Sequence, residues 1–194
     1  MTVTSSTALI VVDAQNSFLH PDGGNFWPGA VSVVEPLQQL LDRARSAPVL
    51  IVHLADRHRA DVRDAEFDRL PRHCVISEFD AEFTDGFGPA PDAAPGHEVV
   101  IEKRRYSGFF GTDLALVLHE HDITEIVLAG VKTNVCVRAT ATDALGHGLH
   151  VTVPREAVAS NRPQLHDASV EDIDRYIGRV VDMATAVDAL TQNP

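Results

Sequence analysis

The sequence has 194 residues, with 16 Lys and Arg against 28 Asp and Glu, a formal net charge of −12 and two cysteines. The acidic balance without a basic tract argues against a nucleic-acid or anionic-membrane partner, and two cysteines are too few for a disulfide scaffold. We expect one domain over residues 1–194, located in the cytoplasm, because no apolar run or leader predicts a membrane span or secretion.

Apolar segments, taken in chain order, predict a parallel sheet covered by helices. Strands are expected at residues 7–12, 48–54, 97–101, 124–129, 150–153 and 179–183. Their apolar residues do not alternate with polar ones, which is typical of strands buried on both faces. Helices are expected at residues 31–45, 112–121, 134–145, 170–180 and 186–191. Strands that alternate with helices indicate an α/β fold with helices on both faces of the sheet.

Residues 55–96 interrupt this alternation. The segment has no sustained hydrophobic period, contains several prolines, and gathers histidines and acidic residues. Loops of this length in compact domains are usually functional or disordered. We expect this one to be functional.

Three residues with complementary chemistry follow three of the predicted strands. Asp13 ends the first strand, Lys103 follows the third, and Cys136 opens the helix after the fourth. The carboxyl ends of parallel strands meet at one edge, so these side chains are expected to lie together. A cysteine that attacks an amide needs a base to take its proton and a cation to stabilise its thiolate. Asp13 and Lys103 fit these roles.

The start of a helix adds two further elements to this hypothesis. The helix dipole favours a thiolate at Cys136, and the backbone N–H groups of Lys132 and Cys136 could form an oxyanion hole. The residues alone leave another interpretation open. In it, Asp13 and Lys103 form an ordinary ion pair and Cys136 is a small buried hydrophobic residue.

Three motifs carry a resemblance to a known family. VVDAQNSF at residues 11–18, KRRYSGFFGTDL at 103–114 and GVKTNVCVRATATDA at 130–144 resemble the isochorismatase-like cysteine hydrolase superfamily, in particular its nicotinamidase-related amidohydrolases. The resemblance implies a three-layer fold with a six-stranded parallel sheet in Rossmann-type order. It also implies that Asp13, Lys103 and Cys136 are the catalytic triad, that the Val131–Lys132 peptide is cis, and that the protein is a homo-oligomer, a dimer or tetramer.

A metal site is implied by the same resemblance. ADRH at residues 55–58 and PRHCV at 71–75 resemble the metal-binding segments of nicotinamidases, and the matching ligands are Asp56, His58 and His73. One carboxylate and two imidazoles suit a zinc-like divalent ion with open coordination positions. Without the resemblance, the three residues would be read as an exposed polar cluster. No organic cofactor is expected.

Five apolar or aromatic residues are candidates for the wall of a substrate pocket, although each could equally be packing: Phe18, Trp27, Leu70, Tyr106 and Phe110. Leu70 stands where nicotinamidases commonly have a tryptophan, which weakens nicotinamide itself as the substrate.

The preferred hypothesis is a cysteine-dependent amidohydrolase that cleaves a small carboxamide, nicotinamide-like or related, through a thioester. The alternatives are a metal-independent hydrolase of a ureido, carbamoyl or aliphatic amide, and an isochorismatase-type vinyl-ether hydrolase, against which Cys136 argues. A small-molecule-binding protein with an inert triad is the non-enzymatic alternative. Thiol reactivity separates it from the enzymes, because an activated cysteine alkylates quickly at neutral pH.

Overall fold

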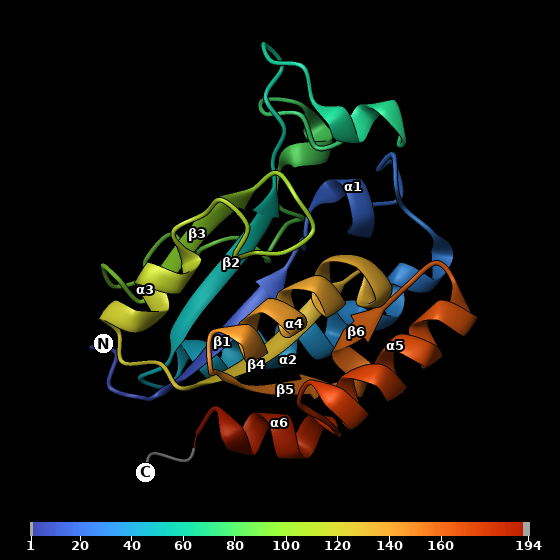
Figure 1. The fold of residues 1–194 in the computed structure, drawn as a ribbon. Coiled ribbons are helices and arrows are strands. Elements are labelled where there is room, and N and C mark those ends of the chain that lie inside the picture. The colour runs from blue at the N-terminus through green and yellow to red at the C-terminus, as the bar shows by residue number, and fades with distance from the viewer. Residues whose placement is uncertain (1, 192–194) are drawn as a thin grey trace.

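The computed structural model describes residues 2–191 and contains a parallel sheet of seven strands (Figure 1). The strand order is β3-β2-β1-β4-β5-β7, and β6 pairs with β4. The strands are β1 (Thr7–Val12), β2 (Leu50–Asp56), β3 (Glu98–Lys103), β4 (Glu125–Val131), β5 (His150–Pro154), β6 (Val158–Ala159) and β7 (Arg179–Val181). The helices are α1 (Asn16–Leu19), α2 (Val34–Arg45), α3 (Leu114–Glu120), α4 (Arg138–Gly146), α5 (Pro163–Tyr176) and α6 (Met183–Ala189).

The prediction of a six-stranded sheet is therefore wrong, because the sheet contains one additional short strand, β6. β5 pairs with the beginning of β4, at residues 125–127, and leaves it before the strand ends. A 3-10 turn at Arg155–Ala157 then returns the chain to the same edge, where β6 pairs with Gly130 and Val131. A strand of two residues has too few side chains to show a period, so the sequence did not reveal it.

The helix predicted at residues 170–180 was misplaced. α5 begins at Pro163, which suits the first turn because proline has no backbone N–H to leave unpaired. The helix ends at Tyr176, and Gly178 then lies against β5: a Cβ there would be 2.3 Å from the Val151 carbonyl oxygen. Two residues of the predicted helix, Arg179 and Val180, belong instead to β7.

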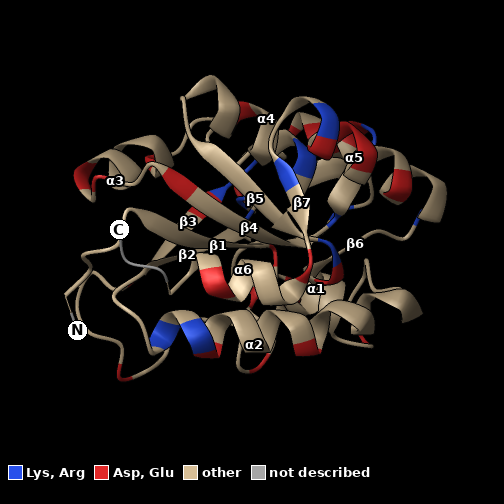
Figure 2. Ribbon diagram, turned by 90° about the horizontal axis from the view of Figure 1, so that it is seen from below, with Lys and Arg blue, Asp and Glu red and all other residues tan. Residues whose placement is uncertain are grey.

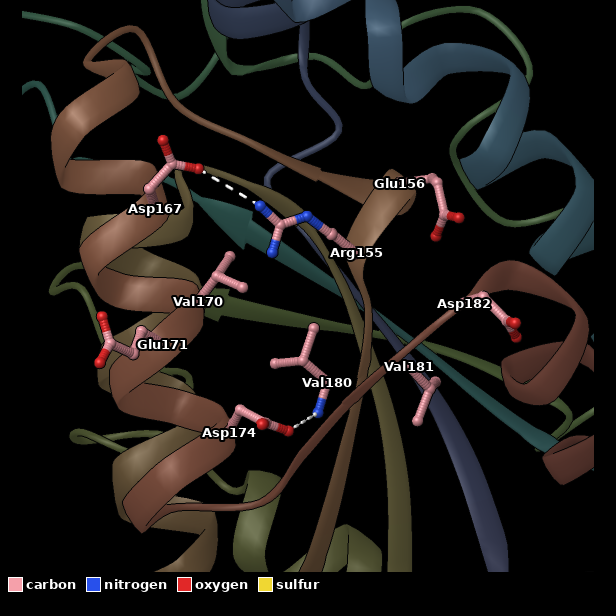
Figure 3. Close-up of a pocket in the computed structure, with 9 residues that line it drawn as sticks. All are labelled: Arg155, Glu156, Asp167, Val170, Glu171, Asp174, Val180, Val181 and Asp182. Atoms are coloured by element: carbon pink, nitrogen blue, oxygen red, sulfur yellow. Dashed lines mark hydrogen bonds and ion pairs between the residues drawn. The ribbon is translucent and has the colours of Figure 1, made fainter.

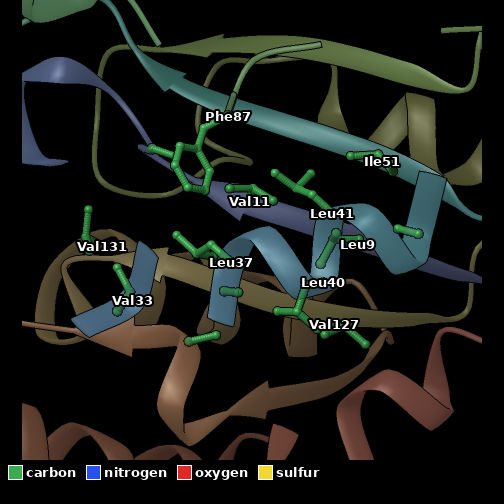
Figure 4. Packing of buried hydrophobic residues seen from close by; sticks show 14 of the residues in the cluster. Leu9, Val11, Val33, Leu37, Leu40, Leu41, Ile51, Phe87, Val127 and Val131 are labelled. Carbon is green, nitrogen blue, oxygen red and sulfur yellow. The ribbon is translucent and has the colours of Figure 1, made fainter. Parts of the chain in front are cut away.

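Alternate residues of β1 enter two separate hydrophobic layers. Leu9 and Val11 pack in a cluster with residues of α2 and α6, and Figure 4 shows their packing with α2. Ala8, Ile10 and Val12 face the other side, in a cluster with residues of α3, α4 and α5. Figure 2 shows the same three layers in a view turned by 90°. The predicted coverage of both faces is confirmed.

The first part of the long segment between β2 and β3 lies at the carboxyl ends of the strands, at the top of Figure 1, and its last part returns to the beginning of β3. Gln15 fastens the first part at the carboxyl ends. The Gln15 side-chain amide donates to the carbonyl oxygens of Asp56 at 2.9 Å and Ala81 at 2.8 Å, and its oxygen accepts from the Asp56 N–H at 2.8 Å. This edge of the sheet is therefore covered by a segment whose backbone is tied to it.

Acidic residues occur on α2, α3 and α5 among other elements, as Figure 2 shows. Within residues 2–191, no helix combines the length and the apolar character that a membrane crossing requires.

Candidate active site

Close contact between the ends of β1 and β4 positions the first candidate residues. Val12 pairs with Gly130, and a Cβ on Gly130 would lie 2.1 Å from the Val12 carbonyl oxygen. Gly130 also has φ +117, a conformation that other residues rarely adopt. The residue directly after β1, Asp13, has φ 53 and turns the backbone away from the strand direction. Only glycine at position 130 allows the two strand ends to approach so closely.

Lys103 connects the candidate base to the candidate nucleophile. Its Nζ lies 3.0 Å from Asp13 Oδ2 and donates to Cys136 Sγ at 3.5 Å. All three residues are buried, with Cys136 the most accessible at 8% exposure. The structure thus brings together the three side chains that the sequence placed at one edge of the sheet.

Cys136 lies in a single π-helical turn, Thr133–Val137, that precedes α4. The predicted helix from residue 134 therefore begins with a wider turn than expected, in which the Lys132 carbonyl accepts the N–H groups of Val135 at 3.0 Å and Val137 at 3.3 Å. The Val131–Lys132 peptide is cis, as the resemblance implied. The N–H groups of Lys132 and Cys136 remain the predicted oxyanion donors.

Burial sets the protonation of this cluster. Desolvation raises the pKa of the Cys136 thiol well above its ordinary value, although Lys103 opposes the shift. The expected lowering of that pKa at the helix start is therefore wrong, because the buried thiol has lost the water that would stabilise its thiolate. Burial also raises the pKa of Asp13 to about 6, again against Lys103. At neutral pH the cluster holds a thiol beside a carboxylate that can take its proton.

The three expected metal ligands converge on one point beside this cluster. His58 Nε2 lies 3.3 Å from Asp56 Oδ1, and His73 Nε2 lies 3.3 Å from Asp56 Oδ2. All three side chains are buried, and one ligand atom from each lies within 4.8 Å of the other two. The exposed polar cluster considered from the sequence is therefore excluded.

The outer nitrogens of both imidazoles are already occupied. His58 Nδ1 is 2.9 Å from Asp64 Oδ2, and His73 Nδ1 is 2.7 Å from the Pro71 carbonyl. These contacts direct both Nε2 atoms inward, and His58 Nε2 has no hydrogen-bond partner among the described residues. A metal-binding histidine usually has such a partner on its other nitrogen. The residues therefore fit a divalent cation.

Asp64 was missed by the sequence analysis. It is buried, caps the short 3-10 turn at Ala65–Asp68 through the Glu66 N–H, and pairs with Arg104 at 3.3 Å and Arg105 at 2.9 Å. The two arginines directly after Lys103 were a signal that a buried carboxylate lies near this edge. Asp64 thus links the arginines that follow β3 to His58.

A cavity of about 200 Å³ opens onto Cys136, Asp56 and His73. Three of the five expected wall residues line it, namely Phe18, Leu70 and Tyr106, together with Lys132 and four residues that were not anticipated: Asn25, Glu66, Val135 and Asn161.

The other two expected wall residues lie elsewhere. Trp27 lines a neighbouring cavity of about 740 Å³, which shares Asn161 with the first. Phe110 is 66% exposed and does not line the cavity at Cys136. An aromatic residue in a loop gives no sequence period from which its direction could be predicted, which explains both corrections.

A further pocket of about 400 Å³ lies between α5 and β7 (Figure 3). Its wall contains none of the residues expected at the site. Arg155 pairs there with Asp167 at 3.3 Å, and both side chains are exposed. This pocket is separate from the cluster around Cys136.

Comparison with known proteins identifies the family. The Isochorismatase domain matches residues 7–185. The chain belongs to the isochorismatase family. Maleamate amidohydrolase from Pseudomonas putida is 36% identical over 193 residues, which cover 95% of this chain and 85% of that protein.

Two solved structures place the isochorismatase-family chain among similar folds. The nicotinamidase from Bacillus subtilis matches with a TM-score of 0.85 at 30% identity, and the match covers 94% of this chain and 100% of that chain. The pyrazinamidase of Pyrococcus horikoshii in complex with zinc matches with a TM-score of 0.79 at 32% identity, and the match covers 91% of this chain and 99% of that chain. The family expected from the three motifs is confirmed.

Proposed function

We propose that this isochorismatase-family protein is an amidohydrolase that cleaves the C–N bond of a small carboxamide, with Cys136 as nucleophile and a thioester intermediate. One observation carries the proposal. Lys103 Nζ lies 3.0 Å from Asp13 and 3.5 Å from the Cys136 sulfur, and Cys136 lines a cavity of about 200 Å³. A base, a cation and a thiol are thereby held together where a small amide can enter.

The first half of the reaction forms the thioester. The Asp13 carboxylate takes the thiol proton as the Cys136 sulfur bonds to the amide carbonyl carbon. Lys103 stabilises the developing charge on sulfur. The N–H groups of Lys132 and Cys136 stabilise the oxyanion, with about 3 kcal/mol lost when one such donor is removed from comparable enzymes. Asp13 then gives its proton to the leaving nitrogen, the C–N bond breaks, and ammonia or an amine departs.

The second half reverses these roles. Asp13 takes a proton from water as the water oxygen attacks the thioester carbonyl. The C–S bond breaks, the carboxylic acid product leaves, and Asp13 returns the proton to the Cys136 thiolate. The raised pKa of Asp13, about 6, suits this repeated transfer because a proton carrier works best near the operating pH.

A zinc-like divalent ion at Asp56, His58 and His73 is part of the proposal. The inward-facing Nε2 atoms and the Asp56 carboxylate supply three ligands. When bound, such an ion would act as a Lewis acid that accepts a substrate oxygen or nitrogen. The zinc complex of the related pyrazinamidase supports this assignment.

Two observations bear on the substrate class. Leu70, rather than an aromatic residue, forms part of the cavity wall, and the relative at 36% identity is named for an aliphatic amide, maleamate. Both favour small carboxamides without requiring an aromatic ring.

The test is ammonia release from a panel of aliphatic, ureido and heteroaromatic amides, measured on as-purified and chelator-treated protein with metal content in parallel. We expect release from at least one carboxamide, and loss of that release together with the metal. A protein that binds carboxamides but hydrolyses none would be the inert binding protein. Release that ignores the chelator would remove the ion from the proposal and leave the Cys136 chemistry.

A further inference from the structure

The sequence contains two lysines, and both lie beside Cys136. Lys103 is neutralised by carboxylates, with Nζ 3.0 Å from Asp13 and 3.8 Å from Asp56. Lys132 lines the cavity together with Cys136, and it takes part in none of the ion pairs found within residues 2–191. Among the described residues, the cavity thus holds one ammonium group without a partner of opposite charge.

Aromatic rings fix the position of this ammonium group. Lys132 Nζ lies 5.6 Å from the ring centroid of Phe18 and 5.6 Å from that of Trp27. A lysine at this distance is attracted to the face of an aromatic ring. Trp27 therefore contributes to the site by holding Lys132, although it does not line the cavity itself. A positioned cation needs less reorganisation to receive a ligand than one on a mobile side chain.

The carboxylates of the cavity are engaged elsewhere. Asp56 contacts Lys103 and both histidines, while Glu66 lies 3.8 Å from His73 and 3.9 Å from Arg105. Partial burial meanwhile lowers the pKa of Lys132, which means that its charge is incompletely solvated. An anion brought into the cavity would compensate that charge.

We propose that the Lys132 ammonium binds a carboxylate on the substrate, so the preferred substrates are small amides that carry a carboxylate in the same molecule. This inference rests on the proposed function and narrows its substrate class. A charged pair formed in a partly dehydrated cavity is stronger than the same pair in water, and it orients the amide toward Cys136. The small cavity, about 200 Å³, suits a short dicarboxylic acid monoamide.

Two substrates that differ only in this group give the test. Succinamate and butyramide have the same amide and chain length, with a carboxylate in the first where the second has a methyl group. We expect the ratio of their kcat/KM values to fall about 50-fold in Lys132→Met, chiefly through the KM of succinamate. Lys132→Arg keeps the charge and is expected to retain the preference within about threefold.

The ratio separates binding from catalysis. If Lys132 acted on the reacting sulfur or the oxyanion, Lys132→Met would slow both amides equally and the ratio would stay constant. An unchanged ratio therefore contradicts the proposal, as does a wild-type protein that prefers butyramide.

A binding measurement tests, without turnover, whether Lys132 binds the substrate carboxylate. Succinamate is titrated by calorimetry into Cys136→Ala and into the same protein carrying Lys132→Met, after thermal unfolding has shown that both are folded. We expect about 50-fold weaker binding in the double variant. Equal affinities would overturn the proposal. Absence of amide hydrolysis in wild-type protein would instead count against the proposed function, and the two failures remain distinguishable.

Discussion

Asp13 and Asp56 stand at the ends of the neighbouring strands β1 and β2, and both are buried close to Lys103. Their acidities are nevertheless opposite. The pKa of Asp13 is raised to about 6, whereas that of Asp56 lies well below the ordinary range of an aspartate. Two identical side chains at equivalent strand ends thus differ in how readily they take up a proton, and in the proposed mechanism only Asp13 carries one.

The neighbours explain the difference. Burial raises the pKa of both carboxyl groups. At Asp13 it prevails over the single cation Lys103, and the negative charge of Asp56 adds to it. At Asp56 the attraction of Lys103 and of the imidazoles of His58 and His73, each 3.3 Å away, outweighs burial. The number of cationic or donor groups around a buried carboxylate, rather than its depth, decides its chemical role here.

Replacing the proton carrier tests one side of this comparison most severely. Asp13→Asn is expected to lower kcat by about 10³-fold or more, because an amide cannot accept the thiol proton and return it. Metal content and the thermal unfolding temperature are measured beside it and should stay close to wild type. Near-normal turnover by Asp13→Asn would remove Asp13 from the mechanism.

Removing an imidazole beside Asp56 tests the other half of the comparison, the proposed metal site. His73→Ala is expected to weaken metal binding by about 100-fold or more, since one of three ligands is lost from a site whose outer contacts alone are worth 10- to 100-fold. Elemental analysis after dialysis measures the bound metal. His119→Ala, in which an exposed histidine of α3 is removed, is the matched control. Equal metal content in the two variants would refute the ligand set.

A change at Asp64 tests the same metal-binding cluster and should have a smaller effect on metal affinity. The Oδ2 atom of Asp64 lies 2.9 Å from His58 Nδ1. Asp64→Asn keeps the size of the side chain but removes its charge, which weakens the contact that orients the His58 ring. We expect metal affinity to fall about 10-fold, with the sheet still folded. Competition with a chromogenic chelator measures the affinity. Wild-type affinity in this variant would show that Asp64 has no part in orienting His58.

The pH dependence of kcat/KM tests the pKa of Asp13 and should show the smallest effect of the four. Asp13 must be ionised to accept the thiol proton, and its pKa is about 6. Below that pH the carboxyl is protonated, so kcat/KM is expected to fall about tenfold for each further pH unit. Above it, the rate should reach a plateau. A profile that is flat from pH 4.5 to 7.5 would contradict the raised pKa of Asp13.

The strand ends were predictable because regular structure placed them. Continuous apolar runs marked β1, β3 and β4, and parallel pairing then brought Asp13, Lys103 and Cys136 to one edge. The helix-dipole argument at Cys136 failed, because periodicity reveals neither a π-helical turn nor the depth of burial.

The segment between β2 and β3 was much less predictable. His58 and His73 were expected to bind a metal only through a family resemblance, and Asp64 and Glu66 were not anticipated at all. Their positions depend on single contacts, such as the Gln15 clamp on Asp56 and Ala81, that leave no pattern in the sequence. Side-chain direction in an irregular segment follows from tertiary contacts, and this also explains the corrections at Trp27 and Phe110.

The most direct test of the account is the rate of ammonia release by Cys136→Ala, measured beside Cys74→Ala on the same carboxamide. Both cysteines are buried, but Cys74 donates only to the Asp80 carbonyl at 3.7 Å and has no place in the proposed reaction. We predict a loss of about 10⁴-fold or more for Cys136→Ala and a near-normal rate for Cys74→Ala. Wild-type turnover by a folded Cys136→Ala protein would contradict the mechanism.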